Sequence, residues 1–133
     1  MLCDLDSFKA INDAHGHGTG DAVLVDVAYT LRKELRAFDL AYRLGGEEFL
    51  VLLPGADAES AAEVAERLRL AVELTRSGGL SVTVSCGAAS SGRLPFHYET
   101  LFAQADAALY RAKADGRNRV GIAGGAESEP ALA

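Results

Sequence analysis

Two adjacent carboxylates, Glu47 and Glu48, stand in a stretch that is otherwise apolar. One apolar run leads into Gly45 and Gly46, and a second leaves the acids at Phe49. This pattern predicts two antiparallel strands joined by a tight turn. Neighbouring side chains on a strand point to opposite faces, so both acids cannot be buried on one side. A bound cation would account for them, and a solvated charged hairpin tip is the alternative.

A second pair of acids, Asp4 and Asp6, lies where the short strand predicted over Met1 to Leu5 ends. We expect Asp6 or Ser7 to cap a helix that continues through Phe8. Free backbone amides at a helix start bind phosphate, and carboxylates beside them would repel it unless a divalent cation intervened. The arrangement therefore suggests Mg²⁺ carried by a nucleotide, or else two acids that only cap the helix.

Residues 12–21 form a glycine-rich segment that we predict to be a loop dense in donors and acceptors. Asn12 offers a donor and an acceptor, and Asp21 offers two acceptors, a combination that suits the edge of guanine. Asp21 equally suits the cap of the next helix. That helix is predicted by apolar residues three and four positions apart, namely Leu24, Val27, Ala28, Leu31 and Leu35.

The elements predicted to position these residues continue along the chain in a clear order. A break over 54–57 caps a third helix, a turn over 77–79 follows, and residues 80–86 alternate as in a half-buried strand. A last helix is expected over roughly 99–114 and a final strand over 118–122. Lys113 and Arg117 make a local positive spot that could hold phosphate or serve the helix dipole.

Length and composition bound the class of protein. The 133 residues suit one domain, with 49% hydrophobic and 24% charged residues as in globular proteins. A net charge of -6 argues against nucleic acid or an anionic membrane as partner. The sequence has no run long enough to span a membrane and no signal peptide, so we expect a cytoplasmic protein.

The cysteines and histidines point to no metal site. Cys3 and Cys86 lie in apolar, strand-like surroundings, which favours buried free thiols over a disulfide or a metal pair. The three histidines lack the spacing of a zinc site.

Four stretches together resemble the GGDEF domain of diguanylate cyclases, in its GGEEF form. They are residues 4–13, 16–21, 43–49 and 105–118, in the order of the family and across nearly the whole chain. The resemblance implies an α/β (α+β) fold with a central, mostly antiparallel five-stranded sheet flanked by helices, like nucleotidyl cyclases and polymerase palms. It implies a domain over 1–123, followed by a tail over 124–133 that we expect to be disordered.

The resemblance also implies an activity, in which two GTP molecules condense to cyclic di-GMP and two pyrophosphates. Mg²⁺, or Mn²⁺, would be the cofactor, held by residues at both acid pairs: Asp4, the carbonyl of Leu5, Glu47 and Glu48. Glu47, Glu48 and Lys9 would be the catalytic residues, with Glu48 aiding proton removal and Lys9 stabilising phosphate charge. The GTP-binding residues implied are Ser7, Phe8, Asn12, His17, Asp21, Lys113 and Arg117.

Further expectations follow from the family pattern. Each subunit would bind one GTP, so catalysis should need a homodimer. Arg36 and Asp39, with Arg67, resemble the RxxD site that binds the product as an inhibitor; a surface ion pair is the alternative. Family members usually carry a further N-terminal helical segment, whereas three residues precede Asp4 here, so a truncated domain without a sensory partner is expected. A weak or inactive domain that binds cyclic di-GMP or GTP is the alternative function.

Overall fold

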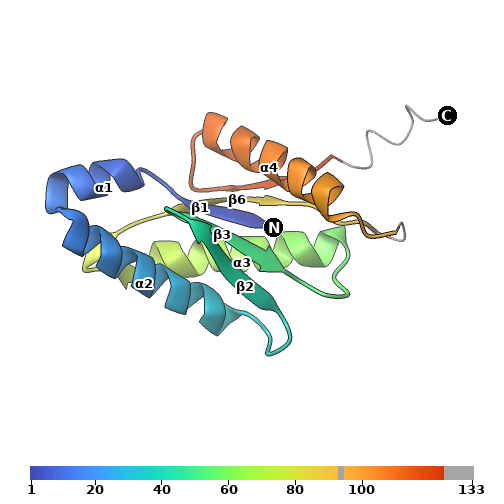
Figure 1. Cartoon of the computed structure of the whole chain (residues 1–133), viewed down its shortest axis with the longest axis horizontal. Helices are drawn as coiled ribbons and strands as arrows, with labels where there is room; N and C mark the ends of the chain where they lie inside the picture. Colours follow the sequence, from blue (N-terminus) through green and yellow to red (C-terminus); the bar gives the residue numbers. More distant parts are fainter. Residues whose placement is uncertain (93–94, 125–133) are drawn as a thin grey trace.

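A central five-stranded sheet carries helices on both faces in the computed structural model, which describes residues 1–92 and 95–124 (Figure 1). The strands lie in the order β2-β3-β1-β6-β7. Three neighbouring pairs are antiparallel and β6 with β7 is parallel, which confirms the predicted mostly antiparallel sheet. Its strands are β1 (Leu2–Leu5), β2 (Leu40–Gly45), β3 (Glu48–Leu52), β6 (Val84–Ala88) and β7 (Val120–Ile122).

The helices divide between the two faces of the sheet. They are α1 (Phe8–His15), α2 (His17–Glu34), α3 (Ala58–Leu74) and α4 (Tyr98–Ala114). Figure 1 shows α4 along one side of the sheet, with α2 and α3 along the other. Alternation along β1 sends Cys3 and Leu5 into the larger core with α2 and α3, whereas Leu2 joins the smaller core under α4. The strand is therefore buried on both faces.

The predicted loop over 12–21 is wrong, because this segment is almost entirely helical. Helix α1 runs to His15, and α2 begins at His17 after the single residue Gly16, which has a φ of 88°. A Cβ at Gly20 would lie 1.8 Å from Asn12 Oδ1. Glycine in this segment thus permits close packing of α1 against α2 rather than a loop. Asp21 consequently lies inside α2 and does not cap it.

The predicted side-chain cap of α1 is also wrong. Ser7 occupies the N-cap position with a left-handed backbone, φ 57°, and makes no side-chain cap hydrogen bond. The Asp6 carboxylate turns into the sheet instead, where it accepts hydrogen bonds from the hydroxyls of Thr83 and Ser85, each at 2.7 Å. These bonds satisfy a carboxylate that is 7% exposed.

The strand expected to be half-buried over 80–86 differs in two respects. It is divided into a short β5 (Leu80–Ser81), which pairs with β4 (Arg76–Ser77), and the central strand β6. All of β6 is buried, because α4 covers the face that carries Ser85 and Gly87. The turn predicted between β4 and β5 is confirmed, with positive φ at Gly78 and Gly79.

Other predicted features are confirmed. The Asp57 side chain caps α3 by accepting from the Ser60 N–H at 2.8 Å. Cys3 and Cys86 are buried free thiols as expected, although their Sγ atoms lie 3.2 Å apart across β1 and β6. The final helix and strand fall within the predicted ranges to a residue or two.

Two further expectations concern the C-terminal tail and membrane-spanning helices. The tail predicted to be disordered lies, from residue 125 onward, outside the described residues. Within the part of the chain that the structure describes, none of the helices is both long and apolar enough to cross a membrane.

Candidate active site

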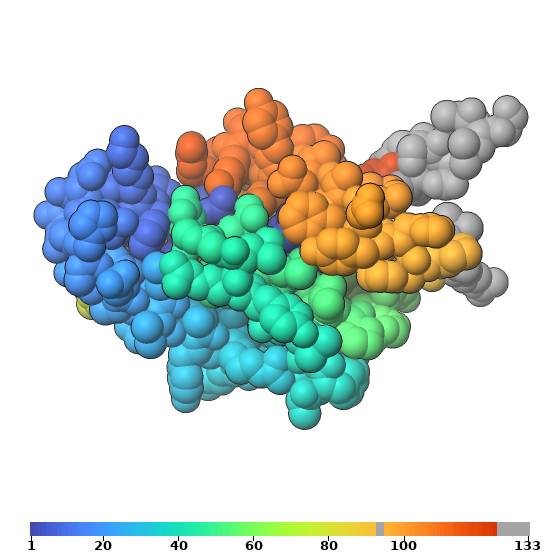
Figure 2. Space-filling model, in the orientation of Figure 1, coloured from blue at the N-terminus to red at the C-terminus, as the bar shows by residue number. Residues whose placement is uncertain are grey.

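The β2–β3 hairpin brings its acids beside those of β1. Asp4 and Glu48 are direct partners across the antiparallel pair of β1 and β3. The Glu47 carbonyl accepts the Leu5 N–H at 3.1 Å, which ties the turn to the end of β1. Figure 2 shows the hairpin, in green, on the surface between α1–α2, in blue, and α4, in orange. Asp4, Glu47 and Glu48 therefore lie near one another at this end of the sheet, close enough for their charges to interact.

The turn of this hairpin is braced by Arg43, a residue that the sequence analysis did not assign. Its Nε and Nη2 donate to the Gly46 carbonyl at 3.0 and 2.8 Å. Gly45 and Gly46 both have positive φ, as a reversal of this kind requires. An arginine beside a glycine turn could have suggested this brace, because the guanidinium fork readily spans one carbonyl oxygen.

Asp4 is a buried carboxylate with one oxygen satisfied. Its side chain points toward α4, where Lys113 Nζ donates to Oδ2 in an ion pair. Oδ1 is buried and has no hydrogen-bond partner among the described residues. Burial raises the pKa of Asp4, and the Lys113 ammonium only partly opposes that effect. Lys113, predicted to bind phosphate, therefore contacts an acid of the site in this structure.

Glu48 lies in a field of negative charge. Burial raises its pKa first, and the nearby charges of Asp4 and Asp106 raise it further, while Lys113 acts in the opposite direction. Such a group binds a proton or a cation more readily than a solvated glutamate does. Asp106, on α4, was not recognised from the sequence as part of this charge cluster.

Two glycines set how closely α4 approaches these acids. A Cβ at Gly87 would lie 2.2 Å from the Ala105 carbonyl oxygen, and one at Gly121 would lie 2.2 Å from that of Ala108. Only glycine permits this contact of helix with sheet. The contact fixes the height of α4 over β6 and β7, and hence the position of Lys113 beside Asp4.

The predicted guanine-binding and phosphate-binding residues come from the α1–α2 junction and the end of α4. Lys9 lies exposed on α1, and His17 and Asp21 lie exposed on the first turns of α2. Asn12 faces Gly20, and its Oδ1 is buried without a partner in the described part of the chain. Arg117 is exposed just beyond α4 in a left-handed conformation, φ 64°.

Two other predicted GTP-binding residues lie at the start of α1. Ser7 is exposed at the N-cap position, and Phe8 packs partly buried against the larger core. Phe8 also faces the α1–α2 contact, because a Cβ at Gly20 would lie 3.3 Å from its Cζ.

The RxxD residues form a closed ion pair at the far end of α2. Arg36 Nη2 donates to Asp39 Oδ1 at 3.0 Å and Nε donates to Oδ2 at 3.1 Å. The hydrogen bonds from Arg36 lower the pKa of Asp39 and outweigh the opposing effect of burial. Asp39 is 1% exposed, so its oxygens are inaccessible. Arg36 itself is 48% exposed and lies over the Phe38 ring, while Arg67 donates to the Glu34 carbonyl close by.

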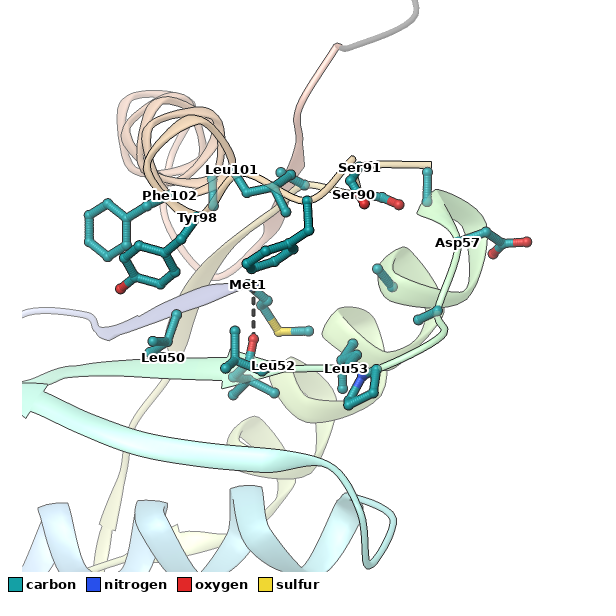
Figure 3. Close-up of a pocket in the computed structure, with 18 of the residues that line it drawn as sticks. Met1, Leu50, Leu52, Leu53, Asp57, Ser90, Ser91, Tyr98, Leu101 and Phe102 are labelled. Carbon is teal, nitrogen blue, oxygen red and sulfur yellow. Dashed lines mark hydrogen bonds between the residues drawn. The ribbon is translucent and has the colours of Figure 1, made fainter. Parts of the chain in front are cut away.

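A large apolar pocket lies away from the acids. It has a volume of about 850 Å³ and is bordered by the start of β1, the end of β3 and the first turns of α4. Figure 3 shows Met1, Leu52, Leu101 and Phe102 around it, with the Met1 amino group donating to the Val51 carbonyl at 2.9 Å. Asp4, Glu48 and Lys113 lie at the opposite ends of the same elements, so this pocket is separate from the candidate active site.

The donor set at the acids fits a hard divalent cation, although it does not form a closed metal cage. Among residues 1–92 and 95–124, no three side chains of His, Cys, Asp or Glu gather as a metal-binding group. A cation with oxygen ligands would nevertheless bind Asp4 Oδ1, which has no partner among the described residues, and would reduce the repulsion between Asp4 and Glu48. The nucleotide phosphates and water could supply the remaining oxygens.

The comparisons with known proteins agree with this architecture. The family model described as diguanylate cyclase, GGDEF domain, matches residues 1–119. The chain is 46% identical over 127 residues to the diguanylate cyclase DgcM of Escherichia coli, covering 90% of this chain and 29% of DgcM. It therefore spans less than a third of that relative's length.

Two solved structures of GGEEF and GGDEF domains share the fold of this chain at lower sequence identity. The active GGEEF domain of a diguanylate cyclase from Vibrio cholerae aligns with a TM-score of 0.85 at 31% identity, over 92% of this chain and 80% of that one. The GGDEF domain of DgcB from Caulobacter crescentus, in complex with c-di-GMP, aligns with a TM-score of 0.81 at 37% identity, over 92% and 75%. The fold and the family match thus define a domain of the GGDEF class. The chain belongs to the diguanylate cyclase GGDEF family.

Proposed function

We propose that this chain is a diguanylate cyclase domain, which condenses two GTP molecules into cyclic di-GMP and releases two pyrophosphates. The observation that carries the proposal is the pairing of Asp4 with Glu48 at the end of the sheet, where Asp4 Oδ1 is buried and has no hydrogen-bond partner among residues 1–92 and 95–124. The family match and the similarity to DgcM support it.

We assign the metal to Asp4, the Leu5 carbonyl, Glu47 and Glu48, with Mg²⁺ or Mn²⁺ as the ion. When bound there, the metal would neutralise phosphate charge and lower the barrier to attack on the α-phosphate. Asp4 would contribute Oδ1, which is buried and accepts no hydrogen bond within the described part of the chain. Glu48, whose pKa is raised, would accept the proton of an attacking 3′-hydroxyl once the metal offsets the neighbouring charges.

The nucleotide would lie across the α1–α2 junction toward the end of α4. The unpartnered Asn12 Oδ1 is an acceptor suited to the N–H groups of guanine, with Asp21 and His17 on the adjacent turns of α2. Ser7, Phe8 and Lys9 begin the helix that borders the phosphates. Lys113 and Arg117 supply positive charge at the distal phosphates, and Lys113 would divide its interactions between them and Asp4.

One subunit holds half of the reactants in this scheme. Each domain would bind one GTP, so attack of a 3′-hydroxyl on the other nucleotide's α-phosphate requires a second GTP held by a facing copy. We therefore propose a homodimer as the catalytic unit, and the rate should rise more steeply than the protein concentration.

The experiment is Glu48→Gln in the 133-residue chain, assayed with GTP and Mg²⁺ after removal of bound product, with chromatography of the nucleotides. We expect loss of cyclic di-GMP formation with an unchanged circular dichroism spectrum, because the amide retains the size of the side chain but cannot take the proton. Glu63→Gln, on the exposed face of α3, is the matched control and should keep full activity. An active Glu48→Gln variant would exclude the proposed role.

A second candidate function, product binding, rests on a different observation. The exposed Arg36 guanidinium donates hydrogen bonds to Asp39, and its Cζ lies 4.5 Å from the centre of the Phe38 ring. These two contacts fix the position of the guanidinium before any ligand binds. We propose that Arg36 and Arg67 contact the product, with Asp39 orienting Arg36, as an inhibitory site. Arg36→Ala should abolish cyclic di-GMP binding in calorimetry, whereas Arg76→Ala, on the separate β4–β5 hairpin, should not. If Arg36→Ala bound cyclic di-GMP as tightly as Arg76→Ala, Arg36 and Asp39 would be only a surface ion pair.

A further inference from the structure

Beyond α4 the chain adopts an unusual backbone. Gly116, Arg117 and Asn118 have positive φ values of 128°, 64° and 47° in succession. Residues other than glycine pay an energetic penalty in the left-handed region, so two in a row persist only where the surroundings hold them. The segment also contains Arg117, which the proposed function places at the distal phosphates of GTP.

Asn118 is the residue that anchors this segment. Its backbone N–H donates to Asp6 Oδ2 at 2.9 Å, which ties the segment to the end of β1. Its side-chain Oδ1 accepts from Arg69 Nη1 at 2.9 Å, and its Nδ2 donates to Glu73 Oε2 at 2.5 Å. Both α3 residues lie on the side of the sheet opposite α4, so one asparagine joins the two layers.

Arg69 is fixed in turn by its own helix. Its Nε and Nη2 donate to the two carboxylate oxygens of Glu66 at 2.8 and 2.6 Å, and Nη1 reaches Glu73 at 3.3 Å. The arginine side chain is 13% exposed, and its two parallel N–H bonds to the Glu66 carboxylate hold the guanidinium in one orientation. Arg69 therefore presents one N–H of a rigid fork to Asn118.

We propose that Arg69, through Asn118, is a positioning residue that holds Arg117 where it grips the distal phosphates of GTP. This proposal rests on the proposed function only for the role of Arg117. Among the described residues, the Arg69 side chain hydrogen-bonds to Glu66, Glu73 and Asn118, and not to Asp4, Glu47 or Glu48. Its effect on nucleotide binding would therefore pass through the backbone of residues 116–118. Its loss would release the left-handed turn and lower the fraction of chains in which Arg117 is correctly placed.

The test compares the binding of 3′-deoxy-GTP, which lacks the attacking hydroxyl, with the binding of GMP, which lacks the distal phosphates. Arg69→Met in the 133-residue chain should weaken 3′-deoxy-GTP binding about tenfold, the loss of roughly one charge-assisted hydrogen bond. GMP binding should be unchanged. Arg76→Met is the matched control and should leave both affinities unaltered.

A double-mutant cycle shows whether the effect passes through Arg117. Arg69→Met should add less than twofold to the loss caused by Arg117→Ala, because the positioned side chain is already absent. Asn118→Gly keeps the left-handed backbone accessible while deleting the side chain, and should reproduce the Arg69→Met result even if that variant folds poorly.

The outcomes separate this inference from the proposed function. Equal weakening of 3′-deoxy-GTP and GMP, additive effects in the cycle, or a wild-type chain that binds both nucleotides equally would each overturn the positioning role. A wild-type chain that makes no cyclic di-GMP would refute the cyclase proposal. The binding comparison would then still decide the role of Arg69, because it requires no turnover.

Discussion

Replacing Gly87 by alanine tests whether the close contact of α4 with β6 positions the active site. The added Cβ would lie 2.2 Å from the Ala105 carbonyl oxygen and 2.3 Å from the Leu109 backbone nitrogen. Both partners are backbone atoms, so no side-chain rotation relieves the overlap. Helix and strand must separate by about 1 Å before the contact becomes ordinary. Overpacking of this kind costs about 1 to 3 kcal/mol of unfolding free energy.

The same displacement of α4 should also move Lys113 relative to the carboxylates of the candidate active site. Lys113 lies on α4 four residues beyond Leu109, which Gly87 contacts, and it is paired with Asp4. A misplacement of about 1 Å at a positioned catalytic group costs on the order of 100-fold in rate. We therefore expect Gly87→Ala to lose both stability and cyclase activity, the second far more than the loss of folded protein explains.

Urea denaturation and the rate of cyclic di-GMP formation measure the two effects on the same preparation. Gly18→Ala is the matched control, because a Cβ there meets nothing within 4 Å and φ is not positive. It should be neutral or slightly stabilising, since alanine favours a helix. A Gly87→Ala chain as stable and as active as the wild type would refute the argument that glycine sets the height of α4.

Two further predictions concern stability. Burial and neighbouring charge raise the pKa of Glu48, so in metal-free buffer its ionisation should lower the unfolding free energy as pH rises from about 4 through the raised pKa. Urea denaturation at several pH values should show that the unfolding free energy of Glu48→Gln falls less steeply with rising pH than that of the wild type. An identical slope in both proteins would contradict this prediction. Asp57→Ala should lower the thermal unfolding temperature by removing the α3 cap, without altering nucleotide affinity; unchanged thermal stability would exclude that cap as a contributor.

Much of the sheet could be predicted from the sequence because its signals are local. The glycine pair between two apolar runs specifies the β2–β3 hairpin, and Gly78 and Gly79 specify the turn between β4 and β5. The cap at Asp57 likewise depends on residues only three positions apart. These features need no knowledge of the rest of the fold.

The mistakes concern residues whose environment is set by distant parts of the chain. Glycines at 16–20 suggested a loop, but Gly20 is glycine because Asn12 packs against it. Ser85 was expected on a solvated strand face, and only the presence of α4 buries it. Gly87 gave no local signal at all, since the helix that it contacts begins eleven residues later at Tyr98.

Asp4 and Asp6 show most clearly what cannot be predicted from the sequence. Their sequence neighbourhoods give no reason to assign them different roles. They lie two residues apart on the same face of the chain and are 8% and 7% exposed. Asp6 accepts three hydrogen bonds, from Thr83, Ser85 and the Asn118 N–H, and is therefore satisfied as a structural acid. Asp4 accepts only from Lys113 and keeps one buried oxygen unpaired among the described residues. An unpaired buried oxygen is costly, so we infer that Asp4 serves as a ligand, whereas Asp6 serves as a structural anchor.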